Sequence, residues 1–303
     1  MLRFLNYKIV KTLFNFLFVP FTHPFASKNI LKTFLRVIRW QILSRQKTEI
    51  IATWINDLKV ICKNGDTGFT GNLYYGLMEY HDMSFAMHLL DSDDTFVDIG
   101  SNLGSYTLLV GGVCQSTTYS LEPSPETFKR LIKNVEINNL ENIQCLNIGA
   151  GDENGSFYMT NDRGPENHLI TDNNVYRSNI KVKVKKIDDI DFESKPTFIK
   201  IDTEGYEYQV IKGAVNTLES SEMIGLLVEI NGNNERFNGT NYEILNLLDK
   251  MGYMPYQFDY NQNDLIKIEQ VNTKGNTLFI KNYDLALKKI KSYKGSTIWG
   301  KSI

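Results

Sequence analysis

The chain has 303 residues, 42% of them hydrophobic, and its 33 basic and 35 acidic residues nearly balance. This length and apolar content suffice for a large buried core, which excludes a disordered chain and a miniature domain held by disulfides. Three widely separated cysteines, with no C-x-x-C pair and no secretory cleavage pattern, favour a cytoplasmic location and argue against structural zinc.

The first 48 residues differ from the rest in charge. They contain nine Lys or Arg residues and no Asp or Glu, which leaves 24 basic and 35 acidic residues in the remainder. We predict two amphipathic helices, the first ending before Pro20 and the second with an apolar stripe beside basic residues. The second helix carries Ile30, Leu31, Phe34, Ile38 and Ile42, interleaved with Lys32, Arg36, Arg39 and Arg45. Charges interrupt both apolar runs, so the segment should not span a bilayer; it either packs on the main domain or lies on an anionic membrane surface.

From residue 94 onward, apolar β-rich runs alternate with helical stretches, which is typical of a mostly parallel sheet covered by helices. The predicted strands are 95–99, 117–121, 143–148, 197–201, 224–230, 253–258 and 276–281, and the predicted helices are 104–113, 125–138, 205–219 and 241–251. A loop rather than a helix joins the last two strands, so the sheet should end in an antiparallel hairpin. Residues 155–160 and 180–187 suggest a further hairpin, and 161–179 a loop over the site.

These patterns divide the chain into four segments. They are a basic helical extension (1–48), lead-in strands and a helix (49–93), the main α/β domain (94–285) and a C-terminal tail (286–303). In the lead-in, Tyr74, Tyr75 and Glu79 are expected in the core or at the entrance of a site.

The first chemical motif, Asp98-Ile99-Gly100-Ser101-Asn102-Leu103-Gly104, follows a hydrophobic strand and opens a helix. Gly100 and Gly104 let the backbone pass close to a ligand, while the helix start offers free N–H groups. The G-x-G-x-x-G fingerprint of dehydrogenases is missing. Asp98 instead suits a ligand with a cationic amino-acid end and hydroxyls, although a glycine turn after a strand can also be a simple tight connection.

The second motif, Glu122-Pro123-Ser124-Pro125, ends the next strand. A carboxylate there can accept hydrogen bonds from both hydroxyls of a ribose. The alternative is an interaction with the dipole of the following helix, which Glu126 would serve better. Asp98 and Glu122 together indicate a nucleoside with a nearby amino-acid moiety, as in S-adenosylmethionine.

Four blocks occur in order: DIGSNLGSYTLL, SLEPSPETFKRLIKNVEINNL, LNIGAGDENG and FIKIDTEGYEYQVIKGA. Together they resemble the FkbM family of S-adenosylmethionine-dependent methyltransferases over about residues 75–260. Ser101 stands where the family commonly has Ala, and the segment around Asn167 and His168 follows no family pattern, which leaves the acceptor undefined.

The resemblance implies a Rossmann-like seven-stranded methyltransferase fold acting on a hydroxyl of a sugar or of a natural-product scaffold. In such an enzyme, the residues around the methionine end would be Asp98, Gly100, Asn102, Gly104 and Thr107. Glu122 would hold the ribose, and Ala150 with Asp152 would flank the adenine. Asp152 beside Gly151 equally fits a turn residue.

Asp202 and Glu204 are the catalytic candidates. Asp202 closes the fourth strand on the same rim as Asp98 and Glu122, where open α/β sheets bind ligands. Methyl transfer from a sulfonium needs alignment and one base, and His168 is the alternative base. Glu207 is expected only to interact with a helix dipole.

A magnesium site is a weaker alternative to the preferred prediction of no metal. Asp202, Glu229 and Asn231 would offer three oxygen ligands on adjoining strand ends. A structural hydrogen bond is the simpler role for Glu229.

The acidic main domain, with Asp-Thr-Glu-Gly after the fourth strand, argues against a nucleic-acid methyltransferase. A catalytically silent membrane adaptor that depends on Arg36 and Arg39 remains an alternative. The preferred prediction is a cytoplasmic O-methyltransferase of a sugar, glycan or glycolipid, held near a membrane by residues 1–48. The sequence predicts no oligomeric state.

Overall fold

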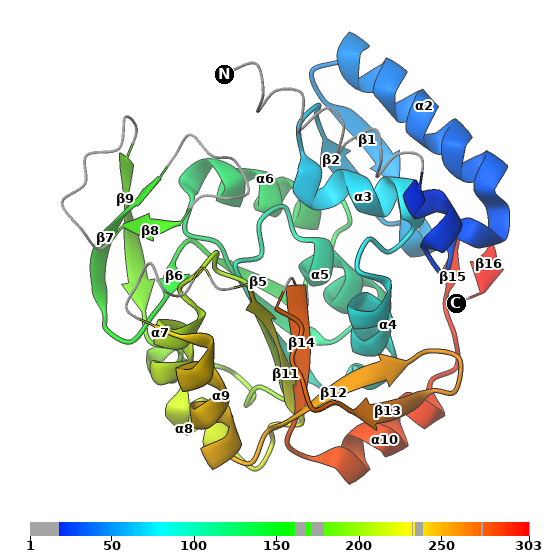
Figure 1. Cartoon of the computed structure of the whole chain (residues 1–303). Coiled ribbons are helices and arrows are strands. Elements are labelled where there is room, and N and C mark those ends of the chain that lie inside the picture. The colour runs from blue at the N-terminus through cyan, green and yellow to red at the C-terminus, as the bar shows by residue number, and fades with distance from the viewer. Residues whose placement is uncertain are drawn as a thin grey trace, which may run out of the picture.

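The computed structural model describes residues 18–160, 168–170, 179–231, 233, 239–273 and 275–302. The predicted strands correspond to β3 (Thr95–Ile99), β4 (Thr117–Leu121), β5 (Ile143–Leu146), β10 (Phe198–Ile201), β11 (Gly225–Ile230), β12 (Met254–Asp259) and β14 (Gly275–Ile280). With β13 (Asp264–Lys267), they form a sheet in the order β13-β12-β14-β11-β10-β3-β4-β5 (Figure 1).

The strands from β11 to β5 in this order run parallel, which confirms the mostly parallel, Rossmann-like sheet. The antiparallel end is also confirmed, since β14 pairs with both β11 and β12. One detail differs from the prediction, because the segment expected to be a plain loop between β12 and β14 contains β13. That strand pairs with β12 and forms the edge of the sheet.

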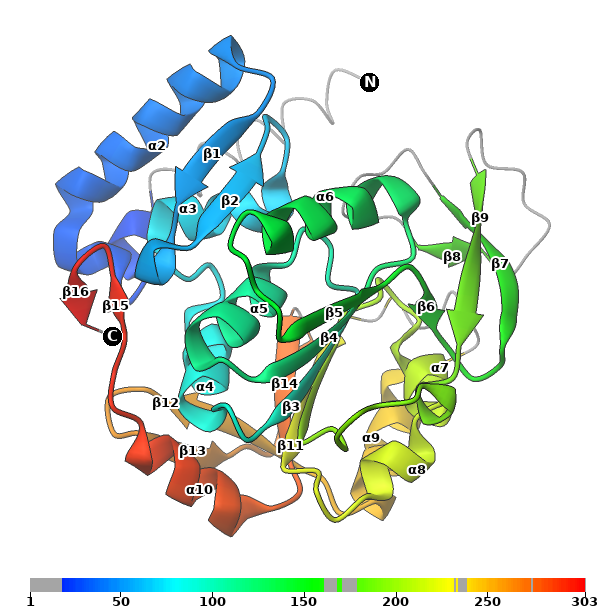
Figure 2. The same ribbon diagram turned by 180° about the vertical axis from the view of Figure 1, so that it is seen from behind.

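Helices cover both faces of the sheet (Figures 1 and 2). One face carries α5 (Ser105–Leu108), which continues as a π-helix over Leu109–Cys114, and α6 (Pro125–Glu136). The other carries α7 (Glu207–Lys212), α8 (Val215–Glu219) and α9 (Asn241–Lys250). The prediction of a single helix over 205–219 is wrong, because this segment contains two helices, α7 and α8. It breaks between α7 and α8 at Gly213, where a side chain would lie 1.8 Å from the Gly151 carbonyl oxygen.

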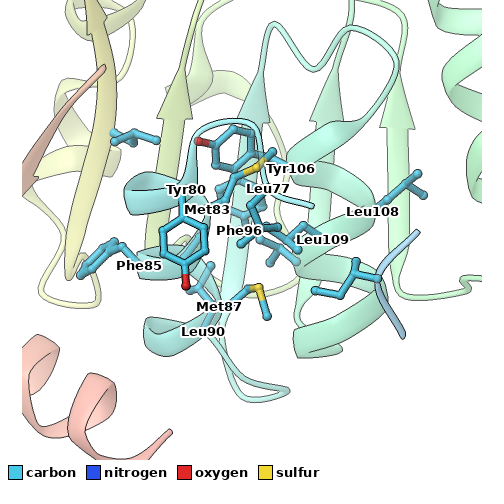
Figure 3. Packing of buried hydrophobic residues seen from close by; sticks show 14 of the residues in the cluster. Leu77, Tyr80, Met83, Phe85, Met87, Leu90, Phe96, Tyr106, Leu108 and Leu109 are labelled. Atoms are coloured by element: carbon cyan, nitrogen blue, oxygen red, sulfur yellow. The ribbon is translucent and has the colours of Figure 1, made fainter. Parts of the chain in front are cut away.

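Strand alternation separates two hydrophobic cores. Phe96 and Phe198 face one core, while their neighbours Val97 and Ile199 face the other. This follows from the two-residue period of a strand, whose successive side chains point to opposite faces. Figure 3 shows the first core, in which Phe96 lies among side chains of α4 (Tyr80–Leu89) such as Met83. The sheet is therefore buried on both sides.

The N-terminal elements form an additional layer. They are a 3₁₀ turn (Ala26–Asn29), α2 (Ile30–Gln46), β1 (Ile50–Thr53), a second 3₁₀ turn (Ile55–Asp57), β2 (Lys59–Cys62) and α3 (Thr67–Tyr75). The predicted helix end before Pro20 is wrong, because residues 18–22 are helical. The His23 N–H donates to the Val19 carbonyl (2.9 Å), a bond that needs no N–H from Pro20.

The C-terminal residues are also ordered elements. They comprise α10 (Tyr283–Ser292) and the short strands β15 (Thr297–Ile298) and β16 (Lys301–Ser302). The two strands lie near the N-terminal layer in both views, whereas α10 lies near β13 (Figures 1 and 2). The Trp299 ring lies 6.0 Å from the Phe25 ring, so the two ends of the described chain are in contact.

A second, smaller sheet stands beside the main one. It comprises β6 (Gly149–Ala150), β7 (Gly155–Thr160), β8 (Leu169–Ile170) and β9 (Asn179–Lys185) in the order β6-β9-β7-β8. The predicted hairpin of residues 155–160 and 180–187 is confirmed by the antiparallel pairing of β7 with β9. Most of the predicted loop 161–179 lies outside the described residues.

Candidate functional site

A cavity of about 340 Å³ opens at the carboxyl ends of the central parallel strands. Carboxylates from four adjacent strands reach the cavity. Asp98 and Glu229 lie near the ends of β3 and β11, and Glu122 and Asp202 directly follow β4 and β10. Ligands of open α/β sheets bind at this edge, because the connections to the helices diverge there. The position agrees with the rim predicted from the sequence.

Asp98 is held by one of its two carboxylate oxygens. Oδ2 accepts hydrogen bonds from the Thr107 N–H (3.0 Å) and hydroxyl (2.7 Å). Oδ1 has no hydrogen-bond partner among the described residues, although the side chain is 1% exposed and lines the cavity. Burial raises the pKa of Asp98. An unpaired buried acceptor is costly, so this oxygen fits a donor supplied by a bound ligand.

Glu122 is fixed by backbone groups on either side. Its Oε1 accepts from the Ser124 N–H (2.9 Å) and its Oε2 from the Asn102 N–H (3.0 Å). Burial raises the pKa of Glu122 to about 7, against the lowering effect of these two N–H groups. Each oxygen keeps a second lone pair, so the carboxylate can still accept two hydroxyl groups.

The loop after β3 has its glycines for two different reasons. Gly100 has φ +78°, and a side chain there would lie 1.8 Å from the Asp202 carbonyl oxygen, so the β3 and β10 ends can approach only with glycine. Gly104 has φ +89° and packs against Leu131 of α6. Gly100 and Asn102 line the cavity, whereas Gly104 and Thr107 lie outside its lining. Thr107 acts through its two hydrogen bonds to Asp98.

The two residues predicted beside an adenine differ in position. Ala150 lines the cavity and is buried. Asp152 is not among the lining residues, and its carboxylate pairs with Lys212 at 2.5 Å. Ala150 therefore lies in the cavity, whereas Asp152 has an ion-pair partner on α7.

Asp202, Glu204 and Glu229 form a second acidic group, with one carboxylate oxygen of each lying within 4.8 Å of the others. Burial and, to a smaller extent, the nearby charges of Asp202, Glu204 and Glu207 together raise the pKa of Glu229 to about 8. Glu229 Oε2 has no hydrogen-bond partner among the described residues. A buried carboxyl group that titrates near neutral pH is suited to accept a proton.

Lys200 is a buried cation at the centre of the site that the sequence reasoning missed. It stands beside Asp98 in the strand register, and its ammonium contacts Asp202 Oδ2 at 2.8 Å. The nearby carboxylates Asp202, Asp98 and Glu79 raise the pKa of Lys200 against the effect of burial. The available signal was a single lysine within the apolar strand TFIKI, since a buried lysine requires acidic partners.

Another wall of the cavity includes Glu79, which directly precedes α4, and Tyr106 of α5. Glu79 lines the cavity and accepts hydrogen bonds from the Tyr106 hydroxyl (2.6 Å) and the Asn276 amide (3.1 Å). Tyr106 also lines the cavity and lies under the Lys200 ammonium, 5.1 Å from its ring centre. Of the three residues expected at the entrance, only Glu79 lines the cavity; Tyr74 and Tyr75 do not.

His168, the alternative base, is 6% exposed and lines the cavity. Its backbone N–H donates to the Thr160 hydroxyl (3.1 Å). Glu207, which was expected only to interact with a helix dipole, accepts from the Thr203 and Gly205 N–H groups (2.9 and 3.0 Å). These hydrogen bonds therefore stabilise the turn that contains Glu204.

The acidic group also offers the oxygen ligands that a divalent cation prefers. Its members are Asp202, Glu204 and Glu229. Asn231 of the predicted magnesium set instead accepts a hydrogen bond from the Asn233 N–H (3.0 Å). Lys200 supplies one positive charge beside Asp202, which offsets part of the negative charge of the cluster.

The chain is similar to known methyltransferases in sequence. The family model described as Methyltransferase FkbM domain matches residues 98–255. Methyltransferase 1 of Beauveria bassiana is 30% identical over 146 residues, which cover 40% of this chain and 59% of the relative. The hexuronic acid methyltransferase AglP of Haloferax volcanii is 28% identical over 146 residues, covering 46% and 57%. The matches thus span less than two thirds of either relative.

Solved structures of low identity resemble parts of the chain. They include a precorrin-6y C5,15-methyltransferase of Geobacter metallireducens (TM-score 0.39, 13% identity), covering 67% of this chain and 87% of that chain. Another is the M. jannaschii protein TYW2 in complex with AdoMet (TM-score 0.40, 9% identity), covering 78% and 87%.

Proposed function

Because this chain belongs to the FkbM family of S-adenosylmethionine-dependent methyltransferases, we propose that it O-methylates a hydroxyl of a sugar, glycan or glycolipid. The single observation that carries the proposal is the pair of buried carboxylates on adjacent strand ends. Asp98 keeps one oxygen without a donor, and Glu122 keeps free lone pairs on both. S-adenosylmethionine has the complementary groups, an ammonium at its amino-acid end and two ribose hydroxyls.

Different residues around the cavity bind different parts of this cofactor. Asp98 Oδ1 accepts from the ammonium, while Glu122 accepts from the ribose hydroxyls. Ala150, which is buried and has no polar side chain, provides a flat apolar surface for the adenine. When bound, S-adenosylmethionine supplies an electrophilic methyl group on a sulfonium that requires no acid to leave.

The protein must then orient the acceptor and remove one proton. Asp202 and Glu204 are the proposed catalytic residues, since both line the cavity beside Asp98. Glu229 joins them as a proton acceptor, because burial raises its pKa to about 8 and one of its oxygens has no partner among the described residues. Lys200 holds Asp202 in position through their ion pair.

Two arguments support a sugar as the acceptor. The relative from Haloferax volcanii is named a hexuronic acid methyltransferase. The cavity also offers several carboxylate oxygens close together at Asp202, Glu204 and Glu229, and such a group accepts hydrogen bonds from a polyol.

Calorimetric titration with S-adenosylmethionine and its demethylated product, followed by mass spectrometry of sugar acceptors, tests the proposal. Micromolar binding is expected, together with methylated product from a hexuronic acid or a neutral glycan. Glu122→Gln should weaken cofactor binding about tenfold, the effect of one charge-assisted hydrogen bond. Glu126→Gln is the matched control, because Glu126 is exposed and its side chain pairs only with Lys129 among the described residues.

Two results would count against the proposal. A folded sample that binds neither adenosyl ligand would overturn the cofactor assignment. Binding without methyl transfer to any sugar would remove the acceptor class and favour the non-catalytic binding protein instead. A chelator titration in the same assay measures the need for a metal.

A further inference from the structure

The outer face of α2 is apolar and exposed. Leu31, Leu35, Ile38 and Ile42 are 71%, 56%, 47% and 52% exposed, although large aliphatic side chains normally avoid water. At about 100° per residue in an α-helix, the four fall within one arc of about 60°. We call these four residues the α2 outer face.

The opposite side of α2 packs on the protein. Its buried residues, Thr33, Val37, Trp40 and Ser44, lie on the far side of the helix from the α2 outer face. Arg36 also turns inward, donating from Nε to the Tyr74 carbonyl (3.0 Å) and lying 4.0 Å from the Trp299 ring centre. The helix is therefore firmly seated, and its apolar outer face is not an effect of loose packing.

Basic residues border the α2 outer face. Lys32, Arg39 and Arg45 are exposed, and their helical positions place them beside the apolar arc. Residues 1–48 contain no acidic residue that could neutralise them. Arg36 does not contribute to this charged border, in contrast to the prediction that it acts together with Arg39, because it is engaged with Tyr74 and Trp299.

We propose that the α2 outer face lies in the headgroup region of a membrane that contains anionic lipids. The apolar arc would enter the boundary between headgroups and acyl chains, and the basic border would contact lipid phosphates. Charge favours this occupant over a second copy of the chain, since a two-fold symmetric contact would bring the same basic border against itself. No helix among the described residues is sufficiently long and apolar to cross a bilayer.

The position of α2 is compatible with such docking. The helix lies at the periphery, with β1 and α3 on its inner side in both views (Figures 1 and 2). Phe21, which is 56% exposed, contacts Phe34 of α2 with ring centres 6.2 Å apart. It extends the apolar surface next to the α2 outer face.

Co-sedimentation of the full chain with vesicles tests this surface. The probes are vesicles of phosphatidylcholine alone and vesicles in which about one third of the lipid is phosphatidylglycerol. Wild type should bind the anionic vesicles at least about tenfold more tightly, and the difference should shrink at high salt. Equal binding to both vesicles, or none to either, would overturn the proposal.

Two sets of variants separate the apolar and the charged contributions. Replacing Leu31, Leu35, Ile38 and Ile42 by Gln should abolish sedimentation with either vesicle. Replacing Lys32, Arg39 and Arg45 by Gln should weaken anionic binding by about 100-fold, or about fivefold for each residue. In this second variant, which lacks the three basic side chains, vesicle binding should no longer depend on salt concentration.

The control removes exposed apolar side chains elsewhere. Ile266 and Tyr242 are 51% and 75% exposed and lie on β13 and α9. Ile266→Gln with Tyr242→Gln should leave sedimentation unchanged, and a loss equal to that of the α2 variant would contradict the proposal. Unaltered melting temperatures establish that every variant folds. A dimer in light scattering that the α2 variant abolishes, without vesicle binding, would assign the surface to a second copy.

Discussion

The two halves of the cavity hold their carboxylates in different ways. On the β3–β4 side, Asp98 and Glu122 are each fixed by hydrogen bonds from neighbouring groups, and the two carboxylates are separately anchored. On the β10–β11 side, Asp202, Glu204 and Glu229 crowd together, with Lys200 as their nearby cation. The first arrangement suits a ligand of fixed shape, and the second suits proton transfer.

The pKa shifts express the same contrast. Burial raises the pKa of Glu122 to about 7, and the backbone N–H groups oppose that rise. Burial, together with three neighbouring carboxylates, raises the pKa of Glu229 to about 8. Backbone N–H groups thus stabilise charge in the proposed cofactor half (Asp98 and Glu122), whereas mutual repulsion of carboxylates destabilises charge in the proposed acceptor half (Asp202, Glu204 and Glu229). Substitutions in the two halves should therefore affect different kinetic quantities.

The largest expected effect is on turnover in the acceptor half. Asp202→Asn should lower kcat by about 100- to 10,000-fold, the usual contribution of a positioned acid or base, while leaving the cofactor Kd within about threefold. Steady-state kinetics combined with calorimetry measures both quantities. A comparable loss of cofactor affinity would show that the two halves are not separable. Asp152→Asn, outside the cavity lining, is the matched control.

The next effect is on affinity in the cofactor half. Asp98→Asn should raise the Kd for S-adenosylmethionine by about 10- to 100-fold, because a hydrogen bond to a charged group contributes about 1.5–3 kcal/mol. Thr107 can still donate to the new amide oxygen, so the local fold should persist. The measurement is calorimetry, with circular dichroism to check folding. Unchanged affinity would remove Asp98 from the binding site.

A pH profile probes the acceptor half directly. A base must be deprotonated to act, so with the pKa of Glu229 near 8, kcat/KM should rise as the pH increases through that value. The expected gain from pH 7 to pH 9 is about tenfold. Glu229→Gln should lower activity and flatten this part of the profile. A variant that keeps the wild-type profile would assign the titration to another group.

Sequence reasoning predicted that Asp98 and Glu122 share one rim of the sheet, and both do line the cavity, because each lies in a short contiguous motif. Asp98 and Glu122 each end an apolar strand and precede a helix, so the local pattern gives both the element and the edge of the sheet. Adjacent parallel strands then place both at one rim. Gly100 was also singled out, although its contact is with the Asp202 backbone, a contact between segments that no local pattern displays.

The acceptor half was predicted less completely because it is assembled from distant segments. Tyr106 of α5 donates a hydrogen bond to Glu79, which directly precedes α4, and Asn276 of β14 donates to Glu79 as well. Such contacts depend on how the layers pack, which strand and helix periodicity do not specify. Lys200 was overlooked although a single lysine in an apolar strand signals acidic partners; the register beside Asp98 then identifies one of them.

The smallest expected effect comes from removing the hydrogen bond between Tyr106 and Glu79. Tyr106→Phe removes the hydrogen bond to Glu79 but keeps the ring beneath Lys200. One such bond contributes about 1 kcal/mol, so the KM for the acceptor should rise about fivefold with little change in the cofactor Kd. Because Tyr106 is buried, the melting temperature should be measured alongside the kinetics. An unchanged acceptor KM would show that Tyr106 only supports the structure. A change in the cofactor Kd alone would show that Tyr106 and Glu79 contribute to cofactor binding rather than to acceptor binding.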